Sequence, residues 1–371
     1  NLWGDNKGNQ AQPLLLSSNG RYIWSEDPIH YTFSDGKLTV TTQKGKIEYG
    51  TAGKNLKEAY EFVSEKYFPP NGKIPEELLF TNPQYNTWIE LVYNQNQKDI
   101  LDIKNEIAQH GISLPVVAKM ERKNAVDNLD SILAEADALM VARGDLGLEC
   151  SLYELPVIQK KIIRACRHAQ KPSIVATQML LSMVKNPIPT RAESTDVANA
   201  VLDGTDCVML SEETAVGNYP VEAVNFIHQI AVHSEEYYLE RIKGPYHPKK
   251  EKNPAKYLAY AACLLGDNTE SAGLVCHSTS GSTARLLSSR RPAQTIYALT
   301  PHQRVIHSLN FYWGVEPRLA EASIPNHLDR VEHFVQDFPY FKPGDTIILT
   351  SGQPTPGQKE MQTNQIKVYY K

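Results

Sequence analysis

The chain has 371 residues, of which 41% are hydrophobic and 22% charged, which is the composition of a globular protein of about two or three domains. Its formal net charge is −4 and no basic stripe stands out, so nucleic acid is not expected as a partner. No apolar run is long enough to cross a bilayer and no signal-peptide pattern opens the sequence, so no membrane partner is expected either.

The first segment has a β pattern. Asn-Gly at 19–20 and Asp-Gly at 35–36 are favourable hairpin turns, and the residues around them alternate in polarity. This predicts antiparallel sheet that forms one face of a sandwich. A helix over 55–68, a loop and a strand over 86–93 are expected to follow.

The pattern of hydrophobic residues changes after an amphipathic helix predicted over 96–111. Four strand–helix units follow, and their strands are apolar almost throughout. The strands are expected over 113–120, 138–143, 172–179 and 207–213, and the helices over 125–136, 152–170, 190–204 and 220–237. Such strands are buried on both faces, which indicates an α/β fold with a parallel sheet and helices outside. An open doubly wound sheet and a (βα)8 barrel both fit.

A linker rich in Pro and Lys over 244–254 separates a further α/β stretch. We expect residues 255–371 to form a small α/β domain, with strands over 271–278, 295–300 and 345–352. The rest of the chain divides into a β-rich segment over 1–98 and a barrel part over 99–243.

Polar side chains lie at the end of each strand of the barrel part or directly after it. The residues are Lys119 and Glu121; Arg143, Gly144 and Asp145; Thr177 and Gln178; and Ser211, Glu212 and Glu213. The carboxyl ends of parallel strands meet at one edge of a sheet, where sites in α/β folds are built.

The residue types suggest a reaction class. Glu121 and Asp145 could share one Mg²⁺, with substrate oxygens completing its shell. Lys119 beside that metal would stabilise a transferring phosphoryl group or an enolate. Gly144 allows a ligand to approach the backbone, and the Thr177 hydroxyl could donate a proton. Taken singly, these residues also fit loop charges, an Arg143–Asp145 ion pair and a packed Thr177 methyl group.

Four stretches together resemble the second half of the pyruvate kinase barrel. They read VVAKMER, MVARGDLGLE, KPSIVATQMLLSM and NPIPTRAESTDVANAVLDGTDCVMLSEETAVGNYPVEAV. The resemblance runs from about residue 99 to Lys371. It implies a (βα)8 barrel with a lid and a C-terminal α/β domain, assembled as a homo-oligomer. It also implies phosphoryl transfer between phosphoenolpyruvate and ADP, giving pyruvate and ATP, with Mg²⁺ or Mn²⁺ and with K⁺.

The resemblance implies roles for individual residues. Lys119 and Thr177 would be catalytic, Glu121 and Asp145 would ligate the metal, and Gly144 and Asp145 would hold the substrate carboxylate. Arg143 lies in the same turn and is expected at the substrate. Glu212 departs from the pattern, because the family usually has glycine there.

The C-terminal domain contains the stretch HSTSGSTARLL, which offers hydroxyl and N–H groups at a helix start. A phosphate could be held there, and a capping Ser/Thr cluster is the alternative. The stretch resembles the loop that binds sugar-phosphate effectors in pyruvate kinases. The residues concerned are Ser278, Thr279, Ser280, Gly281, Ser282 and Thr283.

Residues 1–98 resemble a different family. The stretch NPQYNTWIEL and its neighbours are similar to a family-31 glycoside hydrolase, and the change of resemblance falls near residues 94–102. The first half of the barrel and the lid would then be missing. No K⁺ ligands and no phosphoryl-binding arginine are found before residue 99, so we expect little turnover from this chain alone.

Two other functions stay open at this stage. One is a chimera without catalysis whose C-terminal domain binds sugar phosphates, and the other is a glycoside hydrolase fragment. The five cysteines are odd in number and show no CxxC pairing, which indicates a reducing cytoplasm.

Overall fold

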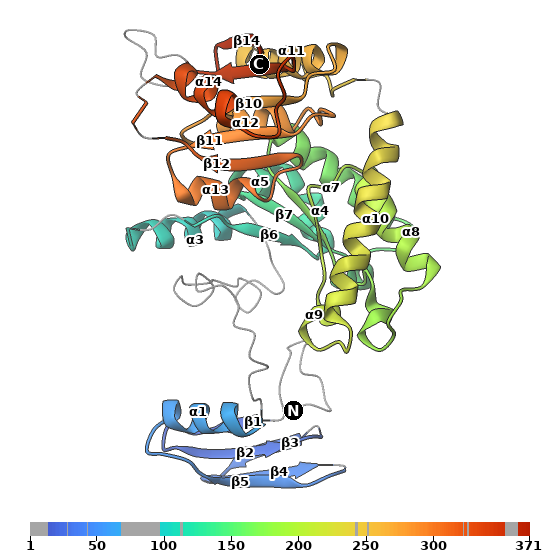
Figure 1. The fold of residues 1–371 in the computed structure, drawn as a ribbon. Helices are drawn as coiled ribbons and strands as arrows, with labels where there is room; N and C mark the ends of the chain where they lie inside the picture. The colour runs from blue at the N-terminus through green and yellow to red at the C-terminus, as the bar shows by residue number, and fades with distance from the viewer. Residues whose placement is uncertain are drawn as a thin grey trace. The chain divides into compact units, whose positions relative to one another are not determined.

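The fold comes from a computed structural model of the chain. It describes residues 14–27, 29–42, 44–67, 97–111, 114–241, 244–250, 252–321, 323–324, 326–352 and 363–371. The chain divides into two compact units, Asn1–Asn86 and Thr87–Lys371. Figure 1 shows their elements in chain order. None of the helices in the described ranges has the length and apolar character needed to cross a bilayer.

The first unit contains short antiparallel strands and one helix. Its elements are β1 (Leu14–Leu16), β2 (Arg21–Ser25), β3 (Ile29–Ser34), β4 (Lys37–Thr42), β5 (Ile47–Thr51) and α1 (Leu56–Tyr67). The strands form a sheet in the order β1-β2-β5 and a separate β3-β4 pair. Both predicted hairpins are confirmed, because Gly20 and Gly36 adopt φ values of 74° and 73° between paired strands. The strand predicted over 86–93 lies outside the described residues.

The second unit begins with alternating strands and helices. The strands are β6 (Val117–Met120), β7 (Ala138–Ala142), β8 (Ser173–Ala176) and β9 (Cys207–Met209). The helices are α3 (Gln97–Gln109), α4 (Lys123–Asp127), α5 (Leu129–Glu135), α6 (Arg143–Glu149), α7 (Leu155–Ala169), η1 (Leu181–Val184), α8 (Arg191–Leu202), α9 (Glu212–Ala215) and α10 (Pro220–Arg241). The four strands are parallel and lie in the order β6-β7-β8-β9, as the apolar pattern predicted.

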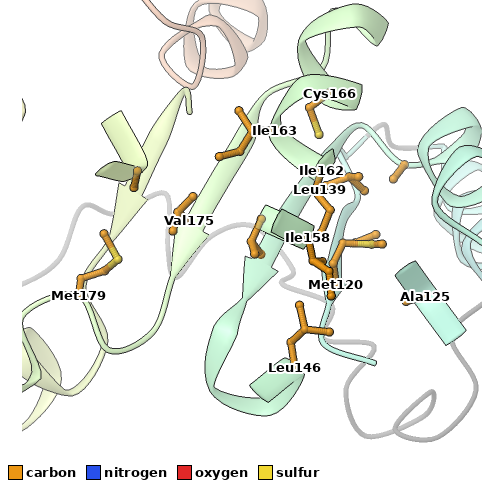
Figure 2. Packing of buried hydrophobic residues seen from close by; sticks show 14 of the residues in the cluster. Met120, Ala125, Leu139, Leu146, Ile158, Ile162, Ile163, Cys166, Val175 and Met179 are labelled. Atoms are coloured by element: carbon orange, nitrogen blue, oxygen red, sulfur yellow. The ribbon is translucent and has the colours of Figure 1, made fainter. Parts of the chain in front are cut away.

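One face of this sheet packs on helices. Met120, Leu139, Val141 and Val175 alternate onto that face and join a single buried cluster with α7. Figure 2 shows the α7 side chains, with Ile162 and its neighbours directed at the strands. Helix α7 buries residues 158, 162, 163 and 166, the spacing of one helical face. The other face of the sheet carries Lys119 and the residues in register with it.

Three strands of the barrel part end earlier than the sequence suggested, and the one predicted over 207–213 stops at Met209. The strand predicted over 138–143 stops at Ala142, and Arg143 is the first residue of α6. The strand predicted over 172–179 stops at Ala176, because Thr177 and Gln178 have φ values of 69° and 55°. A left-handed backbone cannot continue a strand, so the chain turns sharply at the edge of the sheet.

The C-terminal part is a three-layer α/β domain. Its strands are β10 (Gly273–His277), β11 (Ile296–Thr300), β12 (Val315–Leu319), β13 (Thr346–Ser351) and β14 (Gln365–Tyr370). Its helices are α11 (Pro254–Asn268), α12 (Ser282–Ser288), α13 (Gln303–Leu309) and α14 (His327–Asp337). The strand order is β12-β11-β10-β13-β14, parallel except for β14. Helices α11, α12 and α13 pack on one face and α14 packs on the other.

A buried ion pair joins the barrel part to this domain. The Arg291 guanidinium lies 2.9 Å from Asp206, and their side chains are 1% and 3% exposed. Asp206 also accepts hydrogen bonds from the backbone N–H groups of Ser173 and Trp313, at 3.0 Å and 3.2 Å. Asp206 therefore connects the start of β8 with two loops of the C-terminal domain.

Candidate functional site

The strand register brings the predicted site residues to one edge. Met120 pairs with Val141, and Ala142 pairs with Ala176. The residues that follow these pairs therefore leave the sheet side by side at its carboxyl edge. This edge carries Glu121, the turn that begins at Arg143, and Thr177.

Lys119 and Glu121 form the charged centre of this edge. The two side chains lie on the same face of the strand because they are two residues apart. The Lys119 Nζ atom lies 2.6 Å from Glu121 Oε2, and the side chains are 32% and 2% exposed. A buried carboxylate with a half-exposed ammonium beside it leaves the lysine accessible to a ligand while its position stays fixed.

The turn after β7 is hydrogen-bonded to the turn after β8. The Gly144 N–H donates to Thr177 Oγ1 at 2.8 Å, and the Thr177 hydroxyl donates to the Ala176 carbonyl at 2.6 Å. Thr177 is β-branched and has φ 69°, a strained combination that costs about 1–3 kcal/mol and occurs at functional sites. This backbone conformation places the Thr177 hydroxyl against the first turn of α6, and the two hydrogen bonds hold it there.

The Arg143 guanidinium is hydrogen-bonded to other residues of the protein. Its guanidinium donates to Asp196 of α8 at 2.8 Å and to the Thr177 carbonyl at 2.8 Å, and the residue is 7% exposed. This geometry fits a positioning role, in which Arg143 fixes the Thr177 turn. Contact between Arg143 and the substrate stays a prediction.

Asp145 is exposed in the first turn of α6, where a negative charge is favoured by the helix dipole. Together with the buried Glu121 it offers two carboxylates from neighbouring strand ends. Mg²⁺ and Mn²⁺ accept one or two protein carboxylates and take their other ligands from substrate and water, so this donor set fits such an ion. Within the described ranges no group of three or more His, Cys, Asp or Glu side chains is placed to hold a metal.

Sequence reasoning missed the residues that support this edge. Asp196 received no role, although it pairs with Arg143. Glu213 is 1% exposed and accepts hydrogen bonds from the Leu180 and Ser211 N–H groups at 3.0 Å and 2.7 Å, which connects the turns after β8 and β9. No local pattern marks Asp196, whereas Glu213 was named only as one of the polar residues after the fourth strand. The neighbouring Glu212, which departs from the family pattern, is exposed.

The predicted phosphate loop lies at another edge, between β10 and α12. The strand order of the C-terminal sheet reverses between β10 and β13, the position at which open α/β sheets bind ligands. Thr279 and Ser280 are exposed, and Ser282 is half-buried. Ser278 and Thr283 are buried, and the Thr283 N–H donates to Ser278 Oγ at 3.2 Å.

Gly281 of this loop has φ 79°, and a Cβ there would lie 3.1 Å from Val305. The positive φ therefore favours glycine at the helix start, and a Cβ there would make a tight contact with the Val305 side chain.

Comparisons with known proteins identify the family. The family model "Pyruvate kinase, barrel domain" matches residues 74–224, and "Pyruvate kinase, alpha/beta domain" matches residues 256–369. Pyruvate kinase 2 of Synechocystis sp. is 39% identical over 92% of this chain and 60% of its own length. Pyruvate kinase of Agrobacterium vitis is 37% identical over 90% of this chain and 68% of its own length. Pyruvate kinase of Thermotoga maritima is 38% identical over 75% of this chain and 59% of its own length.

A parallel sheet with polar residues at its carboxyl edge, followed by a separate α/β domain, is an arrangement typical of α/β proteins of the barrel class. The comparisons name the group within that class. The chain belongs to the pyruvate kinase family, a family of phosphotransferases. It spans about 60% of the length of the Synechocystis relative.

The barrel match corrects one expectation. Residues 74–98 were assigned to a segment resembling a family-31 glycoside hydrolase, but they fall inside the pyruvate kinase match. The comparisons give that resemblance no support. That resemblance was based on NPQYNTWIEL and the residues around it, which include no catalytic group of the glycoside hydrolase family.

Proposed function

We propose that this chain carries catalytic residues for phosphoryl transfer from phosphoenolpyruvate to ADP, a glycolytic reaction that yields pyruvate and ATP. The observation that carries the proposal is the Lys119–Glu121 pair, 2.6 Å apart at the sheet edge that also holds the turns at Gly144 and Thr177. A transferring phosphoryl group requires a fixed positive charge, and the buried Glu121 carboxylate keeps the Lys119 ammonium in place.

Each group has a defined task in the proposed reaction. The Lys119 ammonium neutralises the transferring phosphoryl group and then the enolate oxygen that remains. The first turn of α6, at Gly144 and Asp145, receives the substrate carboxylate, which would take the Gly144 N–H in place of Thr177 Oγ1. Thr177 Oγ1 lies within hydrogen-bond reach of that turn, so its hydroxyl can support the proton transfer that converts the enolate to pyruvate.

Glu121 and Asp145 would hold Mg²⁺ or Mn²⁺. When bound, the ion supplies positive charge to the phosphoryl oxygens. The family also points to K⁺, for which we assign no ligand among the described residues. Binding of both ions by this chain is part of the proposal.

We further propose that turnover by this chain alone is low. The described residues form four parallel strands of the barrel part, whereas a closed barrel has eight. A homo-oligomer, and a cytoplasmic location, stay predictions of the sequence analysis.

A second candidate function is ligand binding without catalysis, through a sugar-phosphate effector at Ser278–Thr283. It is favoured by the complete five-stranded C-terminal sheet, which places this loop where the strand order reverses.

The deciding experiment measures pyruvate formed from phosphoenolpyruvate and ADP with Mg²⁺ and K⁺. Lys119→Met should reduce turnover at least about 100-fold, the usual scale for one electrostatic group of an active site. Lys123→Met removes a neighbouring lysine whose side chain is 64% exposed, and should leave turnover unchanged. Equal turnover in wild type and Lys119→Met would contradict the proposal. No turnover in the wild type, with saturable binding of a sugar phosphate, would favour the second candidate.

A further inference from the structure

Glu213 is a buried carboxylate to which the reaction described above gives no task. It lies in α9, the short helix before α10 in Figure 1, and is 1% exposed. Its Oε2 atom accepts the Ser211 N–H at 2.7 Å, and its Oε1 atom accepts the Leu180 N–H at 3.0 Å. The bond to Ser211 is local and holds the start of α9. The bond to Leu180 crosses 33 residues of sequence and reaches the turn after β8.

Leu180 ends the turn that Thr177 begins. Thr177 and Gln178 have φ values of 69° and 55°, and such a backbone persists only where contacts on both sides hold it. Arg143 holds the first side, because its guanidinium donates to the Thr177 carbonyl at 2.8 Å. Leu180 is 0% exposed, so water does not replace the Glu213 oxygen at its N–H group. Glu213 therefore holds the second side of the turn.

The Thr177 hydroxyl is the point at which this turn meets the candidate site. It accepts the Gly144 N–H at 2.8 Å and donates to the Ala176 carbonyl at 2.6 Å. A shift of the turn would therefore move the hydroxyl relative to the first turn of α6. The Gly144 N–H bonds to Thr177 and not to Glu213, so its protection from exchange reports where the hydroxyl lies.

From this geometry we propose that Glu213 is a positioning residue for the Thr177 hydroxyl, on which it acts through the turn over 177–180. The effect of Glu213 on catalysis rests on the proposed function, in which that hydroxyl supports the proton transfer that converts the enolate to pyruvate. The alternative is that Glu213 only holds the start of α9. The two roles differ in whether loss of the carboxylate is felt at Gly144.

Amide hydrogen exchange of the full chain, resolved to single residues, tests the proposal without requiring turnover. Glu213→Ala removes both acceptors, so exchange should become faster at Leu180 and, by at least about tenfold, at Gly144. Leu139 reports any general loosening of the sheet, because its N–H lies in the inner strand β7 and donates to the Pro172 carbonyl. The increase at Gly144 should exceed any increase at Leu139.

Glu213→Gln is the second variant, and it keeps the size of the side chain and one acceptor oxygen. Exchange at Gly144 should follow exchange at Leu180 in both variants. Glu236→Gln, at an exposed glutamate of α10, is the matched control and should change neither rate. Faster exchange at Leu180 with unchanged exchange at Gly144 would overturn the proposal, and so would equal increases at Gly144 and Leu139.

Pyruvate formation tests the effect on catalysis separately. In Glu213→Gln, kcat should fall at least about tenfold, while KM for phosphoenolpyruvate should change less than about twofold. The solvent deuterium isotope effect on kcat should rise, because proton transfer is the step that becomes slower. A lower kcat with an unchanged isotope effect would contradict the link to proton transfer. A wild-type chain without turnover would contradict the proposed function, and hydrogen exchange would still decide whether Glu213 positions Thr177.

Discussion

At the residue scale, the candidate site depends on a few groups whose neighbours fix their positions. Glu121 is buried against Lys119, and Thr177 adopts a strained backbone that is held on two sides. Its hydroxyl accepts the Gly144 N–H, and its carbonyl accepts the Arg143 guanidinium. Contacts on more than one side are required to keep a β-branched residue at positive φ. Thr177 therefore contributes geometry as well as a hydroxyl group.

Thr177→Val tests this contribution. Valine has the same shape and the same backbone strain, but it leaves the Gly144 N–H without its acceptor, so unfolding free energy should fall by about 1–3 kcal/mol. Urea denaturation measures the change. Thr177→Ser keeps the hydroxyl and should remain close to the wild type. Equal losses in the two variants would mean that the methyl group, and not the hydroxyl, secures the turn.

At the scale of elements, the packing of α14 on the C-terminal sheet contains a titratable contact. His277, at the end of β10, is 2% exposed and stacks on His327 of α14 with ring centroids 4.1 Å apart. Arg330 of the same helix lies 3.1 Å from its Nε2 atom. Burial, followed by the charges of His327 and Arg330, lowers the pKa of His277 from 6.5 to about 4. His277 is therefore neutral in the folded protein near pH 7.

This shift predicts a pH dependence of stability. The unfolded chain takes up a proton on His277 near pH 6.5, whereas the folded chain resists it until about pH 4. The stability from neutral His277 is thus complete above pH 6.5 and is lost as the pH falls toward 4, by at most about 1.4 kcal/mol per pH unit. Urea midpoints at pH 7 and pH 4.5 measure it. His277→Phe should reduce the loss, and His110→Phe, at a 70% exposed histidine, should not.

At the scale of the whole Thr87–Lys371 unit, one buried ion pair holds the barrel part and the C-terminal domain together. Asp206 precedes β9, and Arg291 follows α12, so neither lies within a regular element. Arg291 also donates to the Gly204 carbonyl at 2.9 Å, which adds a second connection across the same boundary. The charges are almost inaccessible to water, so each depends on the other for its compensation.

Asp206→Asn should destabilise this unit strongly. The substitution leaves the Arg291 charge buried without a counterion, which costs about 3–5 kcal/mol. Denaturation should also change from one transition to two, because the two parts lose their shared ion pair. Glu316→Gln, in the surface pair with Arg318, should cost less than about 1 kcal/mol. A single unshifted transition for Asp206→Asn would show that the boundary is held by apolar contacts.

Local signals in the sequence predicted much of the fold. Apolar strands that alternate with amphipathic helices along the chain predicted the parallel sheet. Asn-Gly and Asp-Gly predicted the first hairpins. Both signals are local. The early ends of β7 and β8 were not predictable, since the hydrogen bonds that hold Thr177 at positive φ come from other strand ends.

For the site, the sequence by itself determined which residue types follow each strand and hence the positions of Lys119, Glu121 and Thr177 at one edge. Only the tertiary structure decided what holds them. Arg143 meets Asp196 across 53 residues, and Glu213 connects two turns that the chain order separates. These contacts depend on strand register and on the packing of α8 against the sheet. Neither can be predicted from a short stretch of sequence.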